Sequence, residues 1–250
     1  MKRFLAAFQF LTIVPLPGRL NPDGQALGGS LPFFPIVGLL IGGAVAFVDW
    51  GLGHFLPVGV TSVFTVILVI AASGGLHIDG LADTADGFFS SRPRERILEI
   101  MKDSRTGAMG VAAIVSVVIL KVALIASVAG PWRSWVLLIT PVAGRCSLLV
   151  QMALLPYARP DGGLAGIFHA SRSRIHPLWA FVFLLAVGGL AGGVPGVVAG
   201  SAAFVVALLF SAYSFRRIGG LTGDTLGAAC ELTELCPAFV AAAMIHGVSV

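Results

Sequence analysis

Residues 107–129 read GAMGVAAIVSVVILKVALIASVA, an apolar run whose single charged residue is Lys121. A helix needs about 20 consecutive apolar residues to cross the hydrocarbon core of a bilayer, whereas a barrel strand needs about 10 residues of alternating polarity. The run has the helical length and does not alternate. It therefore predicts a membrane-spanning helix.

Six more runs of this kind occur along the chain, and no long hydrophilic linker separates them. The predicted spans are approximately residues 31–50, 56–76, 107–129, 134–155, 178–193, 196–214 and 235–250. Such a pattern indicates an all-α fold, a polytopic integral membrane helical bundle of about seven transmembrane helices. We expect a single domain over residues 1–250.

The N-terminal residues 4–17 (FLAAFQFLTIVPLP) form a shorter apolar run, which Pro15 and Pro17 interrupt. A run of this kind after Lys2 and Arg3 is also found in secretory signal peptides, but no small-residue cleavage site follows cleanly. We therefore expect an interfacial or re-entrant segment rather than a full span.

The composition excludes several functions. Hydrophobic residues make up 57% of the chain and charged residues 11%, against about 45–50% and roughly 25% in soluble domains. Too few charges remain to cover a soluble surface, which excludes a water-soluble enzyme, a nucleic-acid binder and a disordered scaffold. The 32 glycines favour close helix packing, within one chain or in a homo-oligomer. Small-xxx-small pairs occur at Gly38/Gly42, Gly188/Gly192, Gly189/Gly193 and Gly196/Gly200.

The charged residues sort by side once the N-terminus is placed in the cytoplasm. Seven alternating spans then put three loops on the cytoplasmic side, residues 77–106, 157–177 and 215–233. All Lys and Arg residues except Lys121, Arg133 and Arg145 lie on that side, in agreement with the positive-inside rule. The acidic residues do so too, apart from Asp49. This concentration of both signs predicts a polar site at the cytoplasmic surface.

The densest polar chemistry is in residues 74–89, GGLHIDGLADTADGFF. On a helix, Asp79, Asp83 and Asp86 share one stripe, where like charges repel unless a cation lies between them. Hard oxygen ligands of this kind favour Mg²⁺, and a solvated acidic helix face is the simpler alternative. His77 lies nearly opposite the stripe and is either a structural residue or a substrate contact.

Further polar residues lie in other segments. Lys102, Asp103 and Arg105 directly precede the span at residue 107, where side chains and a helix N-terminus can hold phosphate. Arg145 falls within a span and needs a partner or an aqueous cavity, and a phosphate or carboxylate would serve. Arg159 lies in a turn-rich loop, as a substrate contact or as an orientation-setting charge.

The third polar segment, residues 216–234, adds Asp224 and Glu231, which are seven residues apart and so share a helix face. No phosphate-binding loop of the G-x-x-x-x-G-K-[ST] type occurs, so phosphates would be held by metal and basic side chains. Together these features indicate metal-assisted transfer chemistry on a diphosphate, with a free carboxylate accepting the proton of an attacking hydroxyl. They do not distinguish phosphoalcohol transfer, prenyl transfer and cation transport.

Four motifs resemble the cobalamin synthase family, also called adenosylcobinamide-GDP ribazoletransferases. They are residues 10–17 (FLTIVPLP), 77–87 (HIDGLADTADG), 100–107 (IMKDSRTG) and 219–224 (GGLTGD). The resemblance implies a multi-pass, Mg²⁺-dependent enzyme of the prokaryotic inner membrane with its active site facing the cytoplasm. In that family, α-ribazole or its phosphate attacks adenosylcobinamide-GDP, GMP leaves, and adenosylcobalamin or its phosphate forms.

The resemblance also implies roles for particular residues. Mg²⁺ and the diphosphate would be bound by Asp79, Asp83 and Asp86. The catalytic set would be Asp83, Asp86 and Asp224. Substrate would be bound by His77, Lys102, Asp103, Arg105, Arg145, Arg159 and Glu231. A CDP-alcohol phosphotransferase is the competing enzyme, since residues 79–83 nearly match its D-G-x-x-A-R pattern, and a cation transporter is the non-enzyme alternative.

Overall fold

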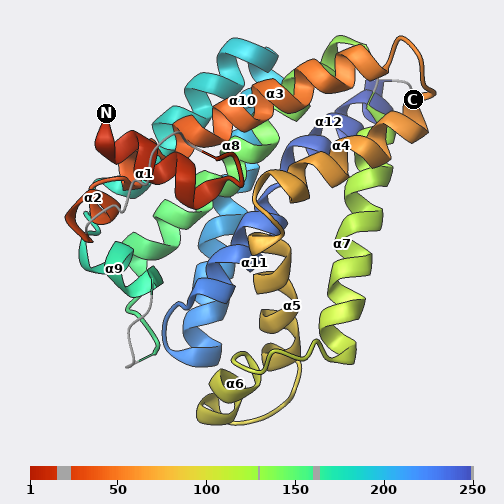
Figure 1. Ribbon diagram of the computed structural model, residues 1–250. Helices are drawn as coiled ribbons and strands as arrows, with labels where there is room; N and C mark the ends of the chain where they lie inside the picture. Colours follow the sequence, from red (N-terminus) through yellow and green to blue (C-terminus); the bar gives the residue numbers. More distant parts are fainter. Residues whose placement is uncertain (16–23, 129, 160–163, 249–250) are drawn as a thin grey trace.

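The computed structural model describes residues 1–15, 24–128, 130–159 and 164–248. Regular structure in these ranges is helical, apart from one isolated bridge between Tyr157 and Leu221. The helices are α1 (Lys2–Leu11), α2 (Gly24–Gly28), η1 (Leu31–Phe33), α3 (Phe34–Leu52), α4 (Val58–Ala72), α5 (Leu76–Phe88), α6 (Arg94–Ile100), α7 (Ala108–Ser127), α8 (Pro131–Leu154), α9 (Leu164–Ala170), α10 (His176–Ile218), α11 (Gly223–Thr233) and α12 (Cys236–Val248). The predicted all-α membrane bundle is confirmed (Figure 1).

The described residues contain five helices long and apolar enough to cross a membrane, or six if a bent pair counts as one span. The bent pair is α4 and α5, which meet at 88°. The predicted span at residues 56–76 is short, because α4 has 15 residues. The predicted span at 235–250 corresponds to α12, which has 13 residues and counts toward a span only together with α11, over Gly223–Gly247. The count of seven stays a prediction.

The predicted fifth and sixth spans both lie in α10, which is a hairpin of two helical arms. Gly193 interrupts the helix with φ 59° and ψ −139°, a left-handed conformation that glycine adopts without steric cost. The rings of Phe181 and Phe204 are 4.7 Å apart between centroids, although a straight helix would separate these residues by about 35 Å. Gly188 and Gly196 let the two arms touch backbone to backbone.

The centre of the bundle is α8, which is almost wholly buried and packs against α3, α10, α11 and α12. Gly38 and Gly42 of α3 lie against the α8 backbone at Pro141 and Leu138, where a side chain would clash. The predicted Gly38/Gly42 pair therefore serves packing inside the chain, as do Gly188 and Gly196 in α10. They are not free to bind a second copy.

The N-terminal helix α1 has ten residues, which span about 15 Å and cannot cross a bilayer. It buries Ala6, Ala7 and Leu11 and packs against α3. Residues 4–11 therefore do not form a span, as predicted. Residues 16 and 17 of the predicted segment lie outside the described residues, and the interfacial position stays a prediction.

The two residues predicted on the far side of the membrane meet each other. Arg133 of α8 donates hydrogen bonds of 2.7 and 2.6 Å to the two carboxylate oxygens of Asp49 in α3, and Thr65 of α4 donates another of 2.7 Å. This ion pair ties three helices together at that end. Much of the remaining polar chemistry lies on α5, on its neighbours α7 and α11, and on α8, which carries Arg145. Figure 1 shows α5 between α7 and α11.

Candidate active site

The bend between α4 and α5 places the acidic helix beside α7 and α11. Gly74 and Gly75 have φ of 63° and 78°, so the chain turns there in a conformation that other residues rarely adopt. Helix α5 then packs along α11 on one side and α7 on the other (Figure 1). The acidic stripe is thus part of a helix packed among spans rather than an exposed loop.

Helices α5 and α11 cross in direct backbone contact, because each has a glycine at the crossing point. A Cβ atom on Gly80 would lie 2.7 Å from the carbonyl oxygen of Asp224, and one on Gly227 would lie 2.8 Å from that of His77. Any larger residue at either position would push the helices apart. The crossing therefore brings Asp79 and Asp83 of α5 to the first turn of α11.

The start of α11 holds Asp224 in place. Thr222 caps the helix: its hydroxyl accepts from the Thr225 amide, and the Thr225 hydroxyl accepts from the Thr222 amide. Leu221 pairs with the loop before Arg159, donating 2.9 Å to Pro156 and accepting 2.8 Å from the Ala158 amide. The loop after α8 is thereby fixed against α11.

This pairing brings Arg159 to Asp224. The guanidinium Nη2 lies 2.6 Å from Asp224 Oδ2 and 3.4 Å from the Met101 carbonyl oxygen. The Arg159 Nε atom is buried and has no hydrogen-bond partner within the described chain. Arg159, expected as a substrate contact or an orientation-setting charge, is thus the basic side chain paired to the acidic residues, and its role toward substrate stays a prediction.

Asp79 and Asp83 form no hydrogen bond or ion pair with the described residues, and both reach the surface. The negative charges of Asp224, Asp79 and Asp86 all act on the Asp83 carboxylate, and only Arg159 acts on it with opposite sign. We call Asp79, Asp83, Asp86 and Asp224 the acidic face. Its excess negative charge is a strong reason to expect a cationic ligand.

Asp86 differs from its neighbours, because both of its oxygens already have partners. It accepts hydrogen bonds of 2.7 Å from the Gly107 amide and 2.8 Å from the Gly110 amide. These are the first amides of α7, which otherwise lack acceptors at a helix start. Asp86 thus joins α5 to the N-terminus of α7, a structural role that its spacing from Asp83 did not indicate.

Asp86 also borders an outer cavity of about 440 Å³. Asp103 and Arg105 line this cavity and pair with each other, with Arg105 Nη2 2.8 Å from Asp103 Oδ2. The hydrogen bonds from Arg105 hold the pKa of the Asp103 carboxyl at about 2. Lys102 is exposed beside them. The predicted phosphate-binding segment therefore lies next to the acidic face, on its solvent side.

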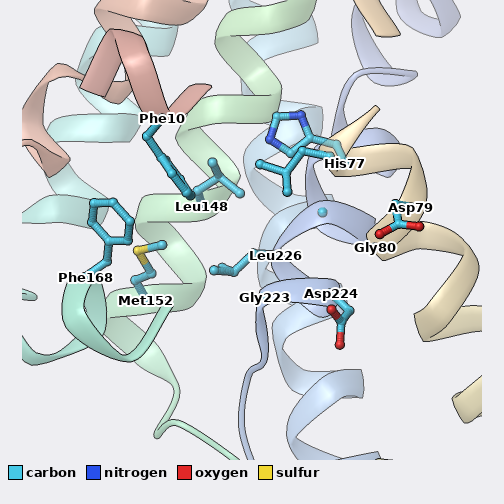
Figure 2. A pocket seen from close by; sticks show the side chains of 12 residues that line it. Phe10, His77, Asp79, Gly80, Leu148, Met152, Phe168, Gly223, Asp224 and Leu226 are labelled. Carbon is cyan, nitrogen blue, oxygen red and sulfur yellow. The ribbon is translucent and has the colours of Figure 1, made fainter. Parts of the chain in front are cut away.

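An inner cavity of about 160 Å³ lies on the other side of the α5 and α11 crossing. Figure 2 shows Asp79 and Asp224 at one side of it and a group of apolar side chains at the other. The apolar group is Phe10, Leu148, Met152, Phe168 and Leu226. Sequence reasoning assigned no role to these residues, because apolar side chains in apolar runs carry no distinguishing signal.

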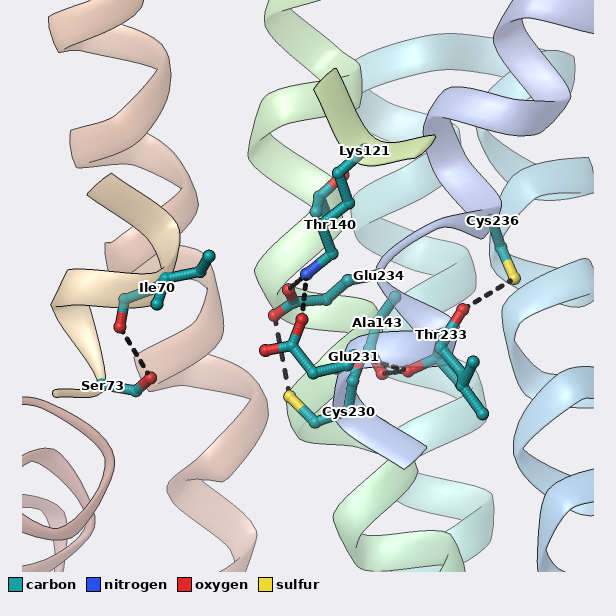
Figure 3. A network of polar contacts seen from close by, with 12 residues as sticks. Ile70, Ser73, Lys121, Thr140, Ala143, Cys230, Glu231, Thr233, Glu234 and Cys236 are labelled. Atoms are coloured by element: carbon teal, nitrogen blue, oxygen red, sulfur yellow. Dashed lines mark hydrogen bonds and ion pairs between the residues drawn. The ribbon is translucent and has the colours of Figure 1, made fainter. Parts of the chain in front are cut away.

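Two predicted substrate contacts lie elsewhere, in a buried network. Arg145 of α8 is fully buried, with Nη1 2.6 Å from Glu234 Oε1. Lys121 of α7 lies 2.6 Å from both Glu231 and Glu234 of α11 (Figure 3). We call these four residues the buried network. Arg145 therefore has a carboxylate partner, one of the two kinds expected for it, and Glu231 neutralises Lys121; their roles as substrate contacts stay predictions.

Sequence reasoning also missed how the C-terminal ends of α5 and α10 join. The Arg217 guanidinium Nη2 donates to the Phe88 carbonyl oxygen at the end of α5, and the guanidinium carbon lies 5.9 Å from the centre of the Phe88 ring. Arg216 and Arg217 were interpreted only as orientation charges. Nothing in the spacing of the two segments could have paired them.

The carboxylates fit a magnesium ion chemically, although no metal cage is preformed. Within the described ranges, no three His, Cys, Asp or Glu side chains converge on one point. Mg²⁺ is usually held by one or two carboxylates together with substrate phosphates and water. Asp79 and Asp83 offer unpaired carboxylate oxygens for that arrangement, whereas each oxygen of Asp86 already accepts one backbone amide, and its role as a ligand stays a prediction.

The fold and the site together define a class. The chain is a multi-pass helical membrane protein whose helices present an acidic face, one paired arginine and two adjoining cavities. This is the make-up of a membrane-embedded enzyme for a polar, phosphate-bearing substrate.

Comparison with known proteins gives the family. A family model described as Cobalamin-5-phosphate synthase matches residues 3–242. An Adenosylcobinamide-GDP ribazoletransferase of a Roseiflexus species is 41% identical over 229 residues, 92% of this chain and 85% of the relative. That of Acetivibrio thermocellus is 38% identical over 94% of each chain, and that of Herpetosiphon aurantiacus is 37% identical over 98% of each.

The chain therefore belongs to the cobalamin-5-phosphate synthase family, and the resemblance seen in the four motifs is confirmed. The match covers nearly the whole chain, so it includes the acidic face, both cavities and the buried network. No solved structure matches this chain.

Proposed function

We propose that this protein joins adenosylcobinamide-GDP to α-ribazole, or to α-ribazole phosphate, and releases GMP. The observation that carries the proposal is the identity of 37–41% to relatives named Adenosylcobinamide-GDP ribazoletransferase, over most of both chains. The acidic face with its two cavities supports it, since the reaction needs carboxylates beside binding space for two substrates.

The transfer needs one bond to form and one to break. A ribose hydroxyl of α-ribazole attacks the phosphorus that bears cobinamide, its O–P bond forms, and the bond from that phosphorus to the GMP oxygen breaks. The hydroxyl proton passes to a carboxylate, for which Asp83 is the best placed, because it has no hydrogen-bond partner in the described chain and lies among three other carboxylates. GMP carries away the bond's electron pair.

Other side chains hold the substrates. Arg159 would bind a phosphate oxygen through the exposed part of its guanidinium while Asp224 keeps the group in place. Arg105 would bind the diphosphate from the outer cavity, and the exposed Lys102 near it would add a second positive charge. Asp79 would hold Mg²⁺ together with substrate phosphates and water, and the ion when bound would neutralise diphosphate oxygens and stabilise the leaving group.

We place the protein in the prokaryotic inner membrane with the acidic face toward the cytoplasm. The distribution of Lys and Arg supports this orientation, because nearly all of them lie in the loops on the side of the acidic face. A cysteine-accessibility measurement on Glu95→Cys in intact cells and inverted vesicles would test it: we expect labelling by a membrane-impermeant reagent in the vesicles alone.

The assay that tests the activity uses purified protein in lipid with Mg²⁺, adenosylcobinamide-GDP and α-ribazole. We expect GMP release that depends on all three. Release of CMP from a CDP-alcohol with no GMP from adenosylcobinamide-GDP would favour the CDP-alcohol phosphotransferase instead. Cation flux into vesicles without any transfer product would favour a transporter.

A further inference from the structure

The inner cavity has the size and polarity of a site for a small aromatic ring system. Its volume of about 160 Å³ is close to that of an apolar cavity of roughly 150 Å³ that binds benzene in another protein. Phe10 and Phe168 provide ring faces at one end, with centroids 4.6 Å apart. A corrin ring is far too large for this space, whereas the open groove beyond Asp79 has a volume of about 750 Å³.

The cavity also contains an unused hydrogen-bonding group. His77 lines it, is only 4% exposed, and its ring has no hydrogen-bond partner among the described residues. Every protonation state of an imidazole keeps at least one N–H donor. Because this donor lines a largely apolar cavity, an occupant that presents an acceptor nitrogen to His77 would satisfy it.

The carboxylates set the orientation of the occupant. Asp79 and Asp224 lie on the side of the cavity away from Phe168 and Met152 (Figure 2). A nucleoside whose base fills the apolar end therefore places its ribose hydroxyls beside the acidic face. A guanine base fits poorly in the same place, because its several donors and acceptors would face Leu148, Met152 and Phe168 without partners.

We propose that the inner cavity binds the base of the attacking nucleoside, a planar dimethylbenzimidazole whose single free ring nitrogen accepts from His77. The proposal rests on the proposed function and adds which substrate the cavity selects. It makes Met152 and Leu148 specificity-determining residues for the size of the base. The guanosine and corrinoid parts of the second substrate bind outside this cavity.

The test compares nucleosides of two sizes in one enzyme preparation. Met152→Ala should raise the ratio of kcat/KM for a naphthimidazole riboside to that for α-ribazole by at least roughly tenfold, since a methylene in an apolar pocket changes selectivity by about 10–200-fold. The KM for adenosylcobinamide-GDP should stay within about twofold, because that substrate does not enter the cavity. The ratio does not depend on the fraction of folded protein.

The matched control is Leu154→Ala, which shortens an exposed residue of the same helix outside the cavity and should leave the ratio unchanged. An unchanged ratio in Met152→Ala, or a rise only in the KM for adenosylcobinamide-GDP, would overturn the proposal, whereas GMP release by the wild type would still support the function.

If the wild type releases no GMP, the proposed function fails. Equilibrium dialysis then tests whether the cavity binds the base. The wild type should bind free 5,6-dimethylbenzimidazole and should not bind guanine. The Met152→Trp variant should bind neither base. Equal binding of 5,6-dimethylbenzimidazole by the wild type and the variant would contradict the assignment.

Discussion

Two groups of carboxylates lie on α11 and its neighbours, and their surroundings differ. The acidic face has four carboxylates and one paired arginine, and it borders both cavities. The buried network has two carboxylates and two cations, Lys121 and Arg145, and it is closed to solvent. Asp224 and Glu231 belong to different groups although they are only about 10 Å apart along one helix.

In this membrane protein, a candidate binding site differs from a structural ion-pair network in its charge balance rather than in the presence of charge. Balanced charges can be buried, because each neutralises the other in a medium of low dielectric. An excess of one sign has to be balanced by solvent or a ligand. Four substitutions test this comparison. We expect the largest effect on activity from the one at Asp83 in the acidic face.

Asp83→Asn should lower the rate of GMP release by a factor of about 10²–10⁴, the usual contribution of a general base. The change keeps the shape of the side chain and removes its charge, so the melting temperature should not fall. Glu95→Gln is the matched control, because Glu95 is exposed on α6 and borders neither cavity. Undiminished release by Asp83→Asn would remove the acidic face from the mechanism.

Glu234→Gln should instead destabilise the fold by about 3–5 kcal/mol, because it leaves Arg145 and Lys121 short of a buried counter-charge. Thermal unfolding in detergent measures the loss. The same change at Glu99, which forms an exposed pair with Arg96, should have little effect. A Glu234→Gln variant of normal stability and low activity would mean that the buried network takes part in catalysis.

Arg159→Ala should lower kcat/KM roughly tenfold, because hydrogen bonds to charged groups contribute about 1.5–3 kcal/mol. We expect most of the effect in KM, since Arg159 is placed to bind phosphate in ground state and transition state alike. Arg172→Ala, in an exposed turn, serves as the control. Equal losses in both variants would indicate a general effect of positive charge on this side of the protein.

Asp86→Asn should have the smallest effect, a loss of about 1 kcal/mol in stability, because an amide oxygen can still cap α7 but can no longer accept as strongly from two amides. GMP release should fall by less than about tenfold, well short of the loss in Asp83→Asn. Equal losses in the two variants would instead restore Asp86 to the metal-binding set predicted from its spacing.

Spacing along one helix predicted well what lies on that helix. Asp79 and Asp83 do share a face, and the apolar run at 107–129 corresponds to α7. Contacts between helices were predicted poorly. Lys121 had no identifiable partner in the sequence, because its partners Glu231 and Glu234 follow more than 100 residues later.

The sequence by itself determined the membrane class, the family and the segment that holds the acidic residues. Hydrophobicity and helical periodicity are local properties, and the motifs are contiguous, so each can be recognised without the fold. Which charged side chains are paired with an opposite charge, and which are not, depends on the tertiary structure. That outcome depends on glycines such as Gly80 and Gly227. Because these residues have no side chain, the two helices can approach closely, and the distance between the helices decides which side chains meet.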